Sequence, residues 1–87
     1  MYDRLLEALE NEVESEGLQR LPENFYADLR STLREFRRRI ADGAEGKVAE
    51  KVLLLQLDRT AQALTRLIET RLRKMIIAGL SRMQLPD

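Results

Sequence analysis

An uninterrupted run from residue 47 to residue 83 constrains this chain more than any other feature of its sequence. The run contains no proline, its first glycine is Gly79, and apolar residues recur through it at helical spacing. One helix of this length would extend ~56 Å, whereas a compact globule formed by all 87 residues is only ~30 Å across. Such a helix either breaks or leaves part of its apolar face for another chain to cover.

Two shorter helices are predicted before it, over about 3–16 and 22–41. Gly17 is expected to end the first helix, Pro22 to occupy the first turn of the second, and Gly43 to cap the second. The Leu-Pro-Asp sequence at 85–87 is expected to end the long helix. The expected fold class is all-α, with three main helices and a long last helix that continues or breaks. They form one helical domain over residues 1–87, an antiparallel bundle that associates with other subunits.

The two short helices can cover only about half of the long one. We therefore expect the leucine triplet at 53–55 to lie inside the bundle. The apolar triplet at 75–77 is expected in the half of the long helix that the two short helices do not cover. The residues predicted to form a subunit interface share the apolar side of the long helix: Leu64, Leu67, Ile68, Leu72, Met75, Ile76 and Leu80.

The composition removes several functional classes. The chain has neither cysteine nor histidine, so it lacks thiol chemistry, disulfides, the commonest metal ligand and the commonest general base. Glu10 and Glu14 lie one helical turn apart, but no third ligand converges on them, so no metal or cofactor is expected. No catalytic motif accompanies the arginines, which argues against a helical enzyme with an arginine-lined site. No apolar stretch is long enough to span a membrane and no secretory leader is visible, which predicts a soluble cytoplasmic protein.

The formal net charge of zero hides a strong pattern. Residues 1–28 carry a net charge of −6, residues 29–40 a net charge of +4, and residues 71–87 a net charge of +3. Segments of opposite sign can pair within the bundle or set the register between subunits.

Seven basic residues are candidates for ion pairs or phosphate contacts. A solvated face paired with the acidic first helix is the simpler interpretation of the arginines on the second helix, and a nucleic-acid-binding face is the alternative. Arg71 lies close to the apolar stripe, where a half-buried arginine needs a specific carboxylate partner. The candidates are Arg30, Arg34, Arg37, Arg38, Arg71, Arg73 and Lys74.

Three segments, in order, carry a family resemblance. The segment from Leu18 to Tyr26 resembles the "LQ-x-LP-x-x-FY" signature of archaeal GINS subunits. The opening at 2–9 resembles the family's "YD-x-LL-x-x-L", and residues 50–53 with 64–76 resemble its "E-K … L-x-x-L … R-x-R-K-I" helix. The chain is most similar to the subunit type that places its helical A domain first, and we expect residues 1–87 to lack the family's β-rich B domain.

The resemblance implies a non-enzymatic scaffold of DNA replication. Its expected partners are other GINS subunits in a homo- or hetero-oligomer, the MCM helicase, a RecJ-like nuclease and primase. The rival hypothesis is a small helical nucleic-acid-binding protein that uses Arg30, Arg34, Arg37 and Arg38.

Overall fold

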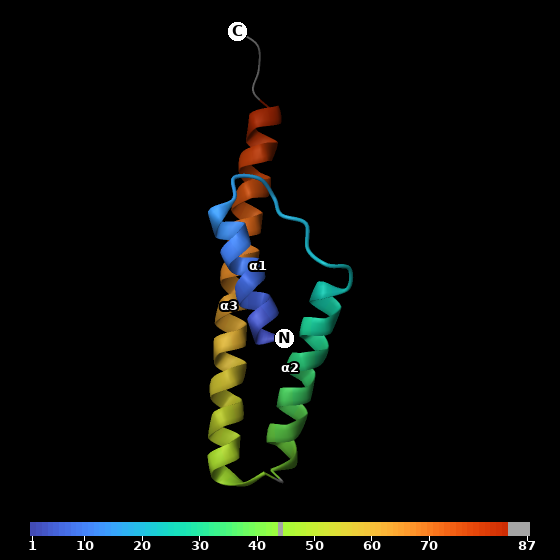
Figure 1. Ribbon diagram of the computed structural model, residues 1–87, viewed down its shortest axis with the longest axis vertical. Helices are drawn as coiled ribbons and strands as arrows, with labels where there is room; N and C mark the ends of the chain where they lie inside the picture. The colour runs from blue at the N-terminus through green and yellow to red at the C-terminus, as the bar shows by residue number, and fades with distance from the viewer. Residues whose placement is uncertain (44, 84–87) are drawn as a thin grey trace.

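The computed structural model describes residues 1–43 and 45–83, and these form three helices with no strand (Figure 1). The helices are α1 (Tyr2–Glu14), α2 (Phe25–Asp42) and α3 (Gly46–Arg82). The molecule is a rod of 65 × 20 × 18 Å with a radius of gyration of 17.2 Å. A compact globule of the same length would have a radius near 12 Å. The all-α prediction is confirmed, and the elongated shape follows from α3.

The long helix is continuous over 37 residues. Gly79 does not interrupt it: the helix continues to Arg82, and its C-cap Met83 donates its N–H to the Gly79 carbonyl at 3.1 Å. The predicted stop at 85–87 lies outside the described residues. Of the two possibilities that the sequence left open, α3 takes the unbroken one.

The short helices begin and end differently from prediction. α1 ends at Glu14, because Ser15 is already extended, so Gly17 lies in the loop and does not cap the helix. α2 begins at Phe25 after Asn24, which adopts a left-handed conformation (φ 65°). Pro22 therefore precedes the helix, where its carbonyl accepts the Phe25 N–H at 3.1 Å. The connection is longer than predicted and spans residues 15–24.

The turn between α2 and α3 follows the prediction at Gly43. This glycine has φ 62° and donates its N–H to the Ile40 carbonyl at 3.2 Å. The left-handed conformation suits glycine because it carries no Cβ. The turn reverses the chain, so α2 and α3 run in opposite directions (Figure 1).

α1 and α2 cover successive stretches of α3, and their own backbones do not approach each other closely within the described residues. α2 lies along the first half of α3, while α1 lies higher and runs in the same direction as α3 (Figure 1). The loop at 15–24 spans the offset between them (Figure 1). The stagger lets two short helices cover more of α3 than they would side by side.

The main core cluster lies where all three helices meet. Leu5 and Leu9 of α1 and Phe25 and Leu29 of α2 pack against Ala63 and Leu67 of α3. Leu67 is fully buried, so the prediction that it contributes to a subunit interface is wrong. The stagger brings α1 over it, and the sequence pattern does not specify that stagger.

The leucine triplet at 53–55 is only partly inside the bundle. Leu53 is buried, whereas Leu54 and Leu55 are about half exposed. Three consecutive residues on a helix span more than one face, and the single neighbour α2 covers only one of these faces.

Candidate interaction surfaces

The C-terminal part of α3 exposes most of the residues that we predicted at a subunit interface. Leu64 is half-buried against the core, whereas the five after Leu67 are exposed, and Ile76 and Leu80 are each more than 60% accessible. We call these five residues the terminal stripe: Ile68, Leu72, Met75, Ile76 and Leu80. The stripe begins level with α1, because Arg71 pairs with Glu12, and α3 then projects past the end of α1 (Figure 1).

Sequence reasoning left two further exposed apolar residues out of this set. Ile77 and Met83 are also exposed, at 57% and 73%. Ile77 lies on another side of α3 from Leu72 and Met75, because consecutive helical residues are rotated by about 100°. Met83 caps the helix and lies about three turns after Leu72, on the same side. The end of α3 is therefore apolar on more than one side.

A buried charged cluster fastens α1 to α3. Glu12 of α1 has no accessible surface. Its Oε1 accepts a hydrogen bond from Arg71 Nη1 at 2.7 Å, and its Oε2 accepts one from Lys74 Nζ at 2.6 Å. The Gln19 N–H donates to the same Oε2 at 3.1 Å. These three donors neutralise the carboxylate and satisfy both of its oxygens.

The surplus positive charge of the cluster is directed to backbone carbonyls. Arg71 Nη1 also donates to the Gln19 carbonyl at 2.7 Å, and Lys74 Nζ donates to the carbonyls of Glu12 (2.6 Å) and Gly17 (2.9 Å). The cluster thus fixes both the last turn of α1 and the first residues of the loop. Arg71 has the intramolecular carboxylate partner that its position on the apolar stripe required.

The pKa of Glu12 is held below its ordinary value. Burial alone would raise this pKa, but hydrogen bonds from Lys74, Arg71 and the Gln19 N–H together outweigh burial. Glu12 therefore stays ionised and is fully occupied by its partners, so it is a structural anchor and is poorly suited to act as a general acid. Sequence reasoning missed it, although its spacing from Leu5 and Leu9 (i, i+4, i+7) placed a carboxylate on the buried side of α1.

The candidate arginines of α2 fall into two groups, and the remaining arginine, Arg39, pairs with Glu45 at 2.6 Å. Arg38 is already paired within its own helix, with Glu35 at 2.6 Å and Asp42 at 3.0 Å. These hydrogen bonds raise the pKa of Arg38 and lower that of Glu35. Arg38 is thus engaged locally and contributes little to a phosphate-binding face.

Arg30, Arg34 and Arg37 form the second group, an exposed row along one side of α2. They border a cavity of about 400 Å³, which we call the arginine groove. The groove has an apolar floor contributed by both α2 and α3: Tyr26, Leu29, Leu33, Leu64 and Ile68. Over residues 1–43 and 45–83, neither this row nor Arg73 forms an ion pair.

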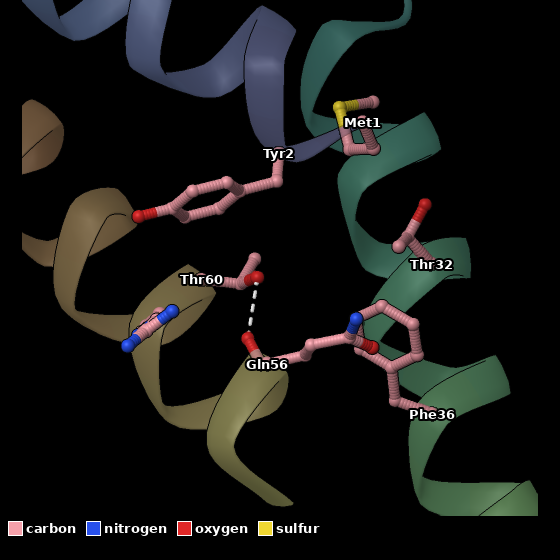
Figure 2. A pocket seen from close by; sticks show the side chains of 7 residues that line it. Met1, Tyr2, Thr32, Phe36, Gln56 and Thr60 are labelled. Atoms are coloured by element: carbon pink, nitrogen blue, oxygen red, sulfur yellow. Dashed lines mark hydrogen bonds between the residues drawn. The ribbon is translucent and has the colours of Figure 1, made fainter. Parts of the chain in front are cut away.

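A second cavity of about 400 Å³ lies where the start of α1 meets the other two helices (Figure 2). Tyr2 and Phe36 extend into it from α1 and α2, and the Thr60 hydroxyl donates to the Gln56 carbonyl at 2.7 Å (Figure 2). Its lining includes a single charged side chain, Arg59. The cavity is therefore lined mainly by uncharged side chains of all three helices.

Comparison with protein-family models, curated proteins and solved structures finds no match to this chain. In the described part of the chain, no three acidic side chains converge as a metal site, and no helix combines the length and apolarity needed to cross a membrane.

Proposed function

We propose that this protein is a non-enzymatic scaffold subunit of a GINS-like DNA replication complex, and that it assembles through the terminal stripe. The observation that carries the proposal is the apolar end of α3, which lies beyond α1 and exposes Ile76 and Leu80 to solvent. Contiguous exposed apolar surface of this kind marks protein–protein interaction sites. Because α3 extends beyond α1 and α2, helices of another subunit can pack against its exposed apolar residues.

The residues behind the family resemblance also support the proposal. Gln19 comes from the segment similar to "LQ-x-LP-x-x-FY", and Arg71 and Lys74 come from the segment similar to "R-x-R-K-I". All three donate hydrogen bonds to Glu12, although more than 50 residues separate Gln19 from Arg71. The segments therefore act together as the fastening of α1 to α3.

In this role the chain itself performs no chemistry, and its partners are other GINS-like subunits, an MCM helicase, a RecJ-like nuclease and primase. The helical domain supplies the subunit contacts. The terminal stripe alone is small beside a standard interface of about 1,600 Å², so several helices of the assembly contribute to each contact.

The proposal is tested by replacing Leu72 and Ile76 together with glutamine and measuring capture of purified GINS subunits and MCM helicase. We expect capture by the wild-type protein and a loss of at least about tenfold in affinity for the variant, because both side chains are exposed in the free chain. The control is Val48→Gln, an apolar residue at the opposite end of α3 that is even more exposed, at 80%. Failure of the wild-type protein to capture any of these partners would contradict the proposal.

A further inference from the structure

We propose that the arginine groove of one copy binds the acidic outer face of α1 of a second copy. The acidic outer face consists of four exposed carboxylates along α1, namely Asp3, Glu7, Glu10 and Glu14. The groove shares only Ile68 with the terminal stripe, and the inference depends on the charged rows of α1 and α2, so it stands independently of the proposed replication role.

The groove has the form of a seat for one amphipathic helix. Its floor is apolar, and both Tyr26 and Ile68 remain about 40% exposed in the single chain. One wall is the basic row, in which successive arginines are four and three residues apart. Residues at this spacing lie on the same side of a helix.

The outer side of α1 carries the complementary features. Leu6 and Val13 are exposed, at 38% and 59%, and lie on the flank of α1 between its buried side and its acidic row. The carboxylates beside them are spaced four, three and four residues apart. α1 therefore presents an unused apolar edge next to an acidic row.

The two rows match in length and in spacing. Glu7, Glu10 and Glu14 span the same seven residues as Arg30, Arg34 and Arg37, which is about 10 Å on a helix. With α1 of one copy antiparallel to α2 of the other, the pairs are Glu14 with Arg30, Glu10 with Arg34 and Glu7 with Arg37. The apolar edge of α1 then faces the floor of the groove.

Within one copy these rows do not meet. The ion pair that joins α1 to α2 is Arg4–Asp28 at 4.0 Å, and it uses neither row. The remaining ion pairs of the described chain also leave both rows free. A second copy supplies carboxylates for the arginine row of α2 and arginines for the acidic row of α1.

A second copy explains the groove better than a nucleic acid does. The floor is largely aliphatic and offers only Tyr26 as a stacking surface, whereas single-stranded nucleic acid is usually bound by several aromatic side chains. The net charge of the chain is zero, so no long-range field attracts a polyanion.

The predicted contact has definite properties. It joins two different patches, so it is heterologous and closes into a ring or continues as a chain. It seats one short helix and falls below the ~1,200 Å² at which stable interfaces begin, so we expect micromolar affinity. Exposed ion pairs are screened by salt, so raising the salt from about 50 mM to about 500 mM weakens the contact.

The test is an exchange of charges between the two rows, read by sedimentation velocity at micromolar concentration. The first variant carries Arg30→Glu, Arg34→Glu and Arg37→Glu, and the second carries Glu7→Lys, Glu10→Lys and Glu14→Lys. Each variant presents like charges at the contact and should remain monomeric alone. An equimolar mixture restores opposite charges on both surfaces and should associate at least about tenfold more tightly than either variant alone.

Single substitutions provide the matched control if a triple variant fails to fold. Arg34→Gln should weaken self-association, whereas Arg38→Gln should not, because Arg38 lies on the same helix but is already paired. Three results would overturn the proposal. These are a wild-type protein that stays monomeric, variants that associate as the wild type does, and a mixture that fails to associate. Salt-dependent DNA binding lost with Arg34→Gln, without self-association, would instead assign the groove to nucleic acid.

Discussion

Replacing Glu12 with glutamine should strongly destabilise the fold, because Glu12 is the only fully buried charged side chain among the described residues. The change keeps the shape of the side chain but exchanges one acceptor oxygen for an NH₂ group. That NH₂ group must face either Lys74 Nζ or Arg71 Nη1, which now lie 2.6 and 2.7 Å from carboxylate oxygens. One donor would thus be directed at another in a buried position.

The size of the effect follows from the burial of the partners. Removing one member of a buried ion pair typically costs 3–5 kcal/mol, because the other charge is left without compensation. The side chains of Arg71 and Lys74 are each 14% exposed and keep their bonds to backbone carbonyls, which places the expected loss near the lower limit, at about 3 kcal/mol. A domain of this size has a total stability of ~4–13 kcal/mol, so the loss is a large share of it.

The assay is thermal and urea unfolding followed by circular dichroism. A loss of about 3 kcal/mol corresponds to a fall in Tm of roughly 12–24 °C for a domain of this size. The control is Glu14→Gln on the same helix, which is exposed and should change stability by less than about 0.5 kcal/mol. A Glu12→Gln variant within about 1 kcal/mol of the wild type would refute the view that this cluster fastens α1 to α3.

Three further predictions concern pH, the core and the turn. Since the pKa of Glu12 is lower in the folded than in the unfolded chain, its contribution should be complete above the ordinary glutamate pKa of about 4.3 and lost as the pH falls through the folded value. Acid titration of unfolding should show this loss in the wild type, and Glu12→Gln should remove that part of the pH dependence. Leu67→Ala should cost about 2–5 kcal/mol in urea unfolding because Leu67 is fully buried, whereas Leu80→Ala at the exposed end should cost less than about 0.5 kcal/mol, and equal effects would contradict the assigned core. Gly43→Ala should lose about 1 kcal/mol because alanine is strained at φ 62°, and unchanged stability would argue against the left-handed cap.

The sequence was sufficient to predict the helices but not their axial positions. The run at 47–83 has neither proline nor an early glycine, so it specified a long helix, and Gly43 specified the end of α2. The stagger of α1 and α2 could not be predicted in the same way. Apolar periodicity identifies which side of a helix is buried, but it does not tell where along a partner that side rests. Leu67 was therefore assigned to the wrong surface.

For the candidate surfaces too, the sequence predicted some features, whereas others required knowing how the helices are arranged. The position of Arg71 on the apolar stripe was enough to predict a specific carboxylate, but identifying Glu12 required knowing that α1 lies beside that part of α3. Likewise, four α2 arginines share a similar pattern in the sequence. Only the fold separates Arg38, which pairs with Glu35 and Asp42, from the row that borders the groove.

In the staggered arrangement, α1 and α2 cover α3 at different positions along its length and share one core cluster. The α2–α3 hairpin joins neighbours in the sequence, whereas docking α1 closes a loop of more than 50 residues between Glu12 and Arg71. Closing that long loop costs more chain entropy, so the hairpin should form first and α1 should add last. Detachment of α1 alone would then uncover Leu67 and extend the exposed apolar surface of α3 toward its N-terminus. The length of this surface would therefore depend on whether α1 is docked.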